Sequence, residues 1–177
     1  MTSVRAGREY YMRLREAYTP PRVELAIIAE SPPASGKYFY DDSGKVSEPL
    51  FAALMQHVGF KNDPPTTKAD GLRRFQAKGW VVVDATYEPV NKLSDLKKTE
   101  LIKRDYPSLC RDLDSLGRPE LVIIKANVCR LLDAVLVRDG FSVLNRGTVV
   151  YFPGFGRQAE FHRQFAYVLK RASEYDG

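Results

Sequence analysis

Two acidic residues that each follow an apolar run are the positions in this chain where chemistry is most expected. Glu30 comes directly after Leu25–Ala29, and Asp84 comes directly after Trp80–Val83. Both runs lack polar alternation, which is typical of parallel strands covered on both faces. Because ligands of such sheets bind beyond the carboxyl ends of the strands, the two carboxylates can share one crevice. There one carboxyl group could act as a general acid and the other as a general base. Alternatively, each carboxylate only braces a loop.

Two further apolar runs end in residues suited to binding. Leu121–Ile124 precedes Lys125-Ala126-Asn127, and Thr148–Phe152 precedes Pro153-Gly154-Phe155-Gly156-Arg157. Glycines let the backbone approach a ligand closely, and amides at a helix start together with Arg157 favour an anion. The same residues could equally form simple strand-to-helix turns, with Asn127 as a helix cap.

Three consecutive aromatic residues, Tyr38, Phe39 and Tyr40, follow the first of these strand ends. One of their rings could stack on a planar ligand, a contact that contributes about 1–3 kcal/mol per base. Lys37 would then lie near the phosphates of that ligand. Alternatively, the three rings pack beneath the loop as part of the core.

The strand ends are positioned by an alternation of strand-like and helix-like segments. Helices are expected at Glu48–Val58, Thr67–Lys78, Asn127–Asp139 and Gln158–Arg171. Pro107 is expected to divide the apolar pattern between the second and third strands into two helices. The alternation predicts a three-layer α/β fold, and the length suits one domain spanning residues 1–177. Phe141–Leu144 is a candidate for an additional short strand.

Composition excludes several classes of protein. No apolar segment approaches the roughly 20 residues of a membrane span, so we expect no association with a membrane. The N-terminal segment lacks the apolar stretch of a signal peptide, so we expect a cytoplasmic protein. Two cysteines and two well-separated histidines provide no metal-site spacing, so no metal, iron–sulfur cluster or other cofactor is expected. The net charge of +5 is compatible with a phosphate-bearing partner without requiring one.

The strand-end motifs resemble those of the uracil-DNA glycosylase superfamily, particularly its iron–sulfur uracil-DNA glycosylases. The Gly-Glu-Ala-Pro-Gly motif of that group corresponds here to Ala29-Glu30-Ser31-Pro32-Pro33. The family's strand-ending asparagine and its Pro-Pro-x-Asn-Arg loop correspond to Asp84 and Glu88-Pro89-Val90-Asn91-Lys92. Its His-Pro-Ser or His-Pro-Ala motif corresponds to Phe152-Pro153-Gly154. The order of elements agrees from Val23 to Arg171.

This resemblance implies an α/β/α sandwich with a four-stranded parallel sheet in the order 2-1-3-4. It implies a monomeric hydrolase that cleaves the N-glycosidic bond of uracil, or of another deaminated or damaged base, flipped out of DNA. Glu30 would stabilise the oxocarbenium-like transition state or position water, and Asp84 would read the edge of the base. Further contacts to the base are expected from Ser31, Tyr38, Phe39, Tyr40, Asn91 and Phe152. Contacts to DNA are expected from Lys37, Lys92, Asn127, Pro153, Gly154, Gly156 and Arg157.

The chain departs from the family's pattern at its chemically important positions. Phe152 replaces the histidine that helps to stabilise the departing base, and the four cluster cysteines are missing. Asp84 replaces an asparagine, and an ionised aspartate only accepts hydrogen bonds. Either Asp84 is protonated in the complex, or the preferred base presents adjacent donors, as the N1 and amino edge of guanine does.

Two alternatives to a glycosylase stay open. One is a nucleic-acid or nucleotide-binding protein that retains the fold without catalysis, as the missing histidine suggests. The other is a metabolic hydrolase or transferase that uses the same crevice for a nucleoside or another small phosphorylated ligand.

Overall fold

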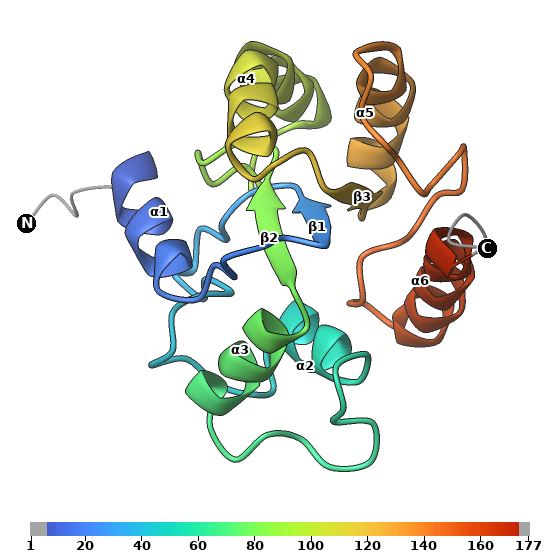
Figure 1. The fold of residues 1–177 in the computed structure, drawn as a ribbon. Coiled ribbons are helices and arrows are strands. Elements are labelled where there is room, and N and C mark those ends of the chain that lie inside the picture. Colours follow the sequence, from blue (N-terminus) through green and yellow to red (C-terminus); the bar gives the residue numbers. More distant parts are fainter. Residues whose placement is uncertain (1–6, 174–177) are drawn as a thin grey trace, which may run out of the picture.

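The computed structural model describes residues 7–173, and its centre is a parallel sheet between two layers of helices (Figure 1). Within these residues the sheet has three strands, β1 (Leu25–Ala29), β2 (Trp80–Asp84) and β3 (Glu120–Ile123), in the order β2-β1-β3. β1 is the central strand, and its Leu25 lies opposite Trp80 on one side and Glu120 on the other. All five residues of β1 and of β2 are buried, as their non-alternating apolar sequences predict.

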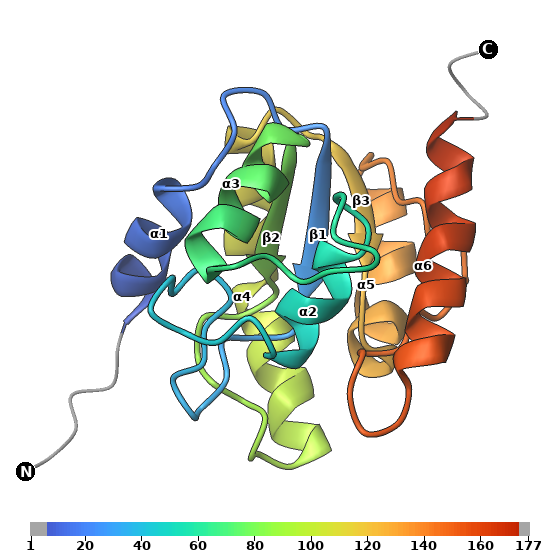
Figure 2. The same cartoon turned by 90° about the horizontal axis from the view of Figure 1, so that it is seen from below.

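Helices cover both faces of the sheet. α4 (Asp95–Ser115) and α5 (Ala126–Arg138) lie on one face, and α2 (Pro49–Met55), α3 (Lys68–Ala77) and α6 (Gln158–Ser173) lie on the other (Figures 1 and 2). α1 (Arg8–Glu16), which the sequence analysis did not predict, lies beside the β2 edge. The four predicted helices outside α4 are confirmed with boundaries that shift by up to three residues. None of the helices in residues 7–173 is long and apolar enough to cross a membrane.

The prediction of a fourth strand at Thr148–Phe152 is wrong. The chain instead approaches β3 at Val143, where a single parallel bridge joins Val143 to Leu121. Beyond that bridge, the Asn145 side chain takes the place of a strand. Its Oδ1 accepts a hydrogen bond from Ile123 N at 2.7 Å, and its Nδ2 donates to Ile123 O at 2.9 Å. Because one amide satisfies both backbone groups of Ile123, the ladder does not continue along this edge of β3.

The prediction that Pro107 divides its segment into two helices is also wrong, because α4 continues through it as one helix of 21 residues. A proline within a helix leaves the carbonyl four residues earlier without its intrahelical donor. Here that carbonyl belongs to Lys103, and both Lys103 and Pro107 are exposed. Water can therefore hydrate the free carbonyl, which lowers the cost of keeping one continuous helix.

Candidate active site at the carboxyl edge of the sheet

Glu30 and Asp84 lie at the ends of neighbouring strands, but their side chains leave the sheet on opposite faces. The register pairs Ala29 with Asp84, so the Asp84 side chain shares a face with Ala29. Successive side chains of a strand alternate between faces, which directs Glu30 to the other side. Its contacts agree, because Glu30 binds Asn127 in the first turn of α5, whereas Trp80, on the same face of β2 as Asp84, packs against α3 on the other side of the sheet. The two carboxylates therefore occupy adjacent but separate surroundings.

Glu30 is buried in an ion pair at the ends of β1 and β3. Its Oε1 lies 2.5 Å from Lys125 Nζ, and its Oε2 accepts a hydrogen bond of 2.6 Å from Asn127 Nδ2. Lys125 precedes α5 with a φ of +77°, a left-handed conformation that is uncommon for a lysine. Asn127 is thus a partner of Glu30 rather than the cap of α5, and its buried Oδ1 has no hydrogen-bond partner in the described part of the chain.

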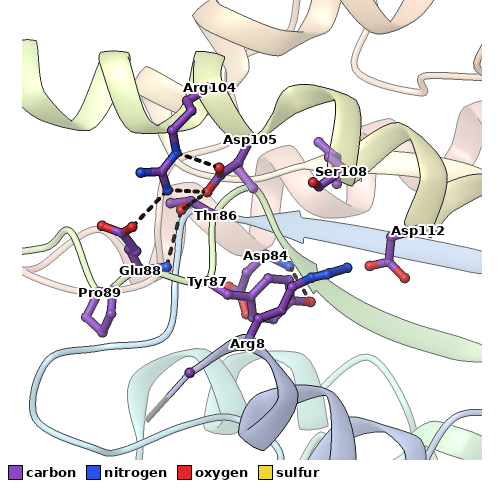
Figure 3. A pocket seen from close by; sticks show the side chains of 13 residues that line it. Arg8, Asp84, Thr86, Tyr87, Glu88, Pro89, Arg104, Asp105, Ser108 and Asp112 are labelled. Atoms are coloured by element: carbon purple, nitrogen blue, oxygen red, sulfur yellow. Dashed lines mark hydrogen bonds and ion pairs between the residues drawn. The ribbon is translucent and has the colours of Figure 1, made fainter. Parts of the chain in front are cut away.

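A pocket of about 470 Å³ opens between α1, the loop after β2 and α4 (Figure 3). This volume lies within the range of roughly 300–1,000 Å³ that is usual for small-molecule sites. Asp84 lines the pocket, whereas Glu30 is not among the described residues that do so. The residues that line it are Gly7, Arg8, Asp84, Ala85, Thr86, Tyr87, Glu88, Pro89, Arg104, Asp105, Ser108, Leu109 and Asp112.

Asp84 is a buried carboxyl group of this pocket whose acidity is strongly altered. Its exposed fraction is 4%, and its Oδ2 has no hydrogen-bond partner among residues 7–173. Burial raises the pKa of the carboxyl to about 7. The positive charge of Arg15 opposes that rise, whereas the negative charges of Asp112 and Glu30 add to it. Asp84 can therefore exchange a proton near neutral pH, and its buried Oδ2 retains an unused capacity to accept a hydrogen bond.

A buried polar cluster fixes the wall behind Asp84. Arg15 of α1 binds both oxygens of Asp112 of α4 at 2.7 and 2.6 Å, and it also donates to Tyr87 Oη at 3.2 Å. The Arg8 guanidinium lies 5.2 Å from the centre of the Tyr87 ring. The sequence analysis missed Arg15, Tyr87 and Asp112. No local pattern signals this cluster, because Arg15 and Asp112 are 97 positions apart.

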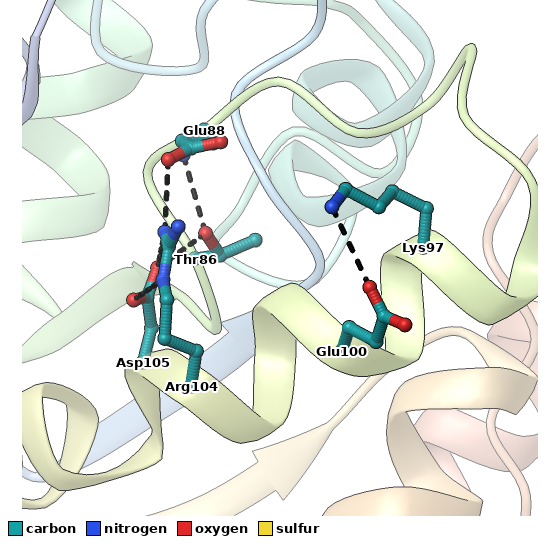
Figure 4. A network of polar contacts seen from close by, with 6 residues as sticks. All are labelled: Thr86, Glu88, Lys97, Glu100, Arg104 and Asp105. Atoms are coloured by element: carbon teal, nitrogen blue, oxygen red, sulfur yellow. Dashed lines mark hydrogen bonds and ion pairs between the residues drawn. The ribbon is translucent and has the colours of Figure 1, made fainter.

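A second network ties the rim of the pocket to α4 (Figure 4). Arg104 donates to Glu88 Oε1 at 2.9 Å and to Asp105 Oδ1 at 2.8 Å, while Thr86 Oγ1 donates to Asp105 Oδ2 at 2.7 Å. Arg104 is shared by two carboxylates. It is therefore a brace of the loop after β2 rather than an uncommitted anchor for phosphate.

The aromatic triplet is part of the core. The exposed fractions of Tyr38, Phe39 and Tyr40 are 3%, 6% and 1%. The Phe39 ring meets Phe75 edge to face with centroids 5.2 Å apart, and Tyr40 Oη accepts a hydrogen bond from the backbone N–H of Val82 at 2.8 Å. Other parts of the protein cover these rings, so the structure offers no open ring face for the predicted stacking on a base.

The loop after β1 and the loop after β2 are joined to each other. Ser31 Oγ accepts a hydrogen bond of 3.2 Å from the N–H of Val90, and Asn91 Oδ1 accepts one of 2.9 Å from the N–H of Ala34. Ser31 and Asn91 thus hold loops together in this structure instead of presenting their oxygens to a pocket. Lys37 and Lys92, predicted to contact DNA, are exposed on these same loops.

The segment from Phe152 to Arg157 follows Val150, whose carbonyl accepts a hydrogen bond from Lys125 N at 2.8 Å. Phe152 is half-buried, and Pro153 and Gly154 are buried. Gly156 has a φ of +80°, and the exposed Arg157 pairs with Glu160 at 3.0 Å. Phe155 is completely exposed, a feature that the sequence analysis missed. This segment is a candidate nucleic-acid contact.

No group of three or more histidine, cysteine, aspartate and glutamate side chains within the described residues is arranged to hold a metal ion. No protein-family model, curated protein or solved structure matches the chain. What the site does must therefore follow from its own geometry and charge.

Proposed function

We propose that this protein is a hydrolase that cleaves the N-glycosidic bond of a nucleobase, in the manner of a DNA glycosylase. One observation supports this most strongly. Asp84 is a buried carboxyl group with a pKa of about 7 that lines a pocket of about 470 Å³ at the carboxyl edge of a parallel sheet. A pocket of that volume accommodates a ligand of nucleoside size, and the carboxyl group can supply or accept a proton beside it.

The two carboxyl groups have different parts in the proposed reaction. Asp84 lines the pocket and would donate a proton to the departing base or accept one from the attacking water. Glu30 pairs with Lys125 and accepts a hydrogen bond from Asn127 at the next strand end. Because the transition state of glycoside cleavage carries positive charge, the negative charge of Glu30 would stabilise it electrostatically without lining the pocket.

DNA is the proposed carrier of the base. The net charge of +5 favours a polyanionic partner, and the fully exposed Phe155 can insert between bases or stack on them. An enzyme that takes a base from a duplex must first flip it out, and an exposed apolar side chain can fill the space that the base leaves.

A second candidate function is binding without catalysis. The observation that favours it is the complete engagement of Glu30 by Lys125 and Asn127, away from the pocket-lining residues. A non-catalytic protein of this kind would bind DNA in a salt-dependent manner and leave every base in place.

The test is base release from oligonucleotides that each contain one uracil, hypoxanthine, xanthine or ring-alkylated guanine. Abasic product is measured by cleavage in alkali, for the wild type, Asp84→Asn and Glu30→Gln. Asp114→Asn is the matched control because Asp114 is an exposed acid of α4 outside the pocket-lining set. We expect Asp84→Asn to lower the rate about 100-fold or more, Glu30→Gln to lower it clearly, and the control to leave it unchanged. DNA binding with no abasic product from any substrate would instead establish the non-catalytic function.

A further inference from the structure

The charge around Asp84 is unbalanced. The described residues that line the pocket contribute four carboxyl groups and two guanidinium groups, from Asp84, Glu88, Asp105, Asp112, Arg8 and Arg104. Arg104 is shared by Glu88 and Asp105, and Asp112 is paired with Arg15. Asp84 lacks such a partner, and its buried Oδ2 accepts no hydrogen bond within residues 7–173. The pocket therefore favours a ligand that brings positive charge and N–H donors to this carboxylate.

On the basis of the proposed function, we propose that the base taken into this pocket is a positively charged, ring-alkylated purine of the 7-methylguanine type. Such a base presents adjacent donors, N1–H and the exocyclic amino group, which can reach one carboxylate as a pair. Its ring also carries a positive charge, which could pair with Asp84 because Arg15 is already engaged by Asp112. Uracil presents a single N–H between two carbonyl oxygens, and those oxygens would face the carboxylate unfavourably.

The Tyr87 ring of the pocket wall also accepts a flat cation. The planar Arg8 guanidinium lies over the Tyr87 ring, 5.2 Å from its centre. The hydroxyl of that ring is fixed by Arg15, which donates to it at 3.2 Å. A cationic purine ring that took the place of Arg8 over this ring would gain the same cation–π attraction, and a neutral pyrimidine would not.

The charge of the base also eases the bond cleavage. When the bond between C1′ of the sugar and N9 breaks, its electron pair goes to the purine ring and cancels the ring's positive charge. The water oxygen then bonds to C1′, and the proton released from that water passes to the Asp84 carboxylate and on to solvent. The base departs neutral, so no residue must stabilise an anion. Uracil would depart as an anion into a pocket rich in carboxyl groups.

The experiment compares oligonucleotides that are identical except for one 7-methylguanine, uracil or hypoxanthine. The free base is quantified by mass spectrometry near neutral pH, with the wild type, Asp84→Asn and the control Asp114→Asn. We expect the wild type and the control to release 7-methylguanine at least about 10-fold faster than uracil, the size of one charge-assisted hydrogen bond. Asp84→Asn should lose at least about 10-fold of this preference.

A binding measurement on the wild type separates the two proposals. We expect 7-methylguanosine to bind at least about 10-fold more tightly than guanosine, because only the former carries the positive ring charge. Equal affinities, or faster release of uracil than of 7-methylguanine, would overturn the inference about the base while leaving glycosidic cleavage intact. Preferential binding of 7-methylguanosine without release of any base would support the pocket's selectivity and overturn the proposed catalysis.

Discussion

Asp84→Asn should stabilise the protein at neutral and alkaline pH. The substitution replaces a buried carboxyl group by an amide of the same shape, which cannot ionise. Burial raises the pKa of Asp84 from 3.8 to about 7, so between these values the folded protein holds a proton that the unfolded chain has released. The wild type therefore loses stability as the pH rises from 3.8 to 7. At about 1.4 kcal/mol for each pKa unit, the loss amounts to about 4 kcal/mol above pH 7.

The assay is urea unfolding of the wild type and Asp84→Asn across this pH range. Contributions of all other titrating groups are common to both proteins, so the difference between their free energies of unfolding isolates Asp84. We expect the free energy of unfolding of the variant to rise by about 4 kcal/mol relative to that of the wild type from acid to neutral pH. Above pH 7 the difference should stay constant. The exposed control Asp114→Asn should stay within about 0.5 kcal/mol of the wild type. A difference between the wild type and Asp84→Asn that does not change with pH would refute the reasoning, because Asp84 would then titrate as it does in the unfolded chain.

Two further predictions concern side chains outside the pocket. Asn145→Ala should destabilise the protein by about 2–5 kcal/mol, because Ile123 N and O would both lose their buried partner. Urea unfolding at fixed pH would measure this loss. A loss as small as that of a surface substitution would contradict the prediction and show that water replaces the amide. Burial and the neighbouring His162 lower the pKa of His57 from 6.5 to about 4. As the pH falls, the unfolded chain therefore binds a proton at this histidine before the folded protein does, and the protein should lose stability between pH 6.5 and pH 4. The loss should be smaller in His57→Gln, and an identical acid profile in that variant would contradict this assignment.

The sequence predicts the central sheet well and its edge poorly. Leu25–Ala29 and Trp80–Val83 are recognisable because both faces of these strands are covered, which leaves continuous apolar runs. Thr148–Phe152 is also apolar, but the side chain of Asn145 prevents it from pairing with β3 as a strand. Asn145 occupies the edge of β3, and an asparagine 22 positions from the backbone it binds gives no periodic signal.

The candidate site is predicted only in part for a similar reason. Asp84 is found because it ends a buried strand, and the structure places it in a pocket. Its separation from Glu30 depends on strand register, which a single sequence does not reveal. Arg15 and Asp112 meet only through the packing of α1 against α4, and the buried rings of Tyr38–Tyr40 show that an aromatic run near a strand end can equally be core.

The central claim is that Asp84 is the protonatable group that meets a base in the pocket. Carbon-13 NMR of the Asp84 carboxyl group during a pH titration tests it most directly, with assignment by Asp84→Asn and with 7-methylguanosine added or omitted. The account predicts a titration near pH 7 in the free protein and a lower pKa in the complex, because the cationic base stabilises the carboxylate. A carboxyl group that titrates near 4 and does not respond to the nucleoside would contradict it.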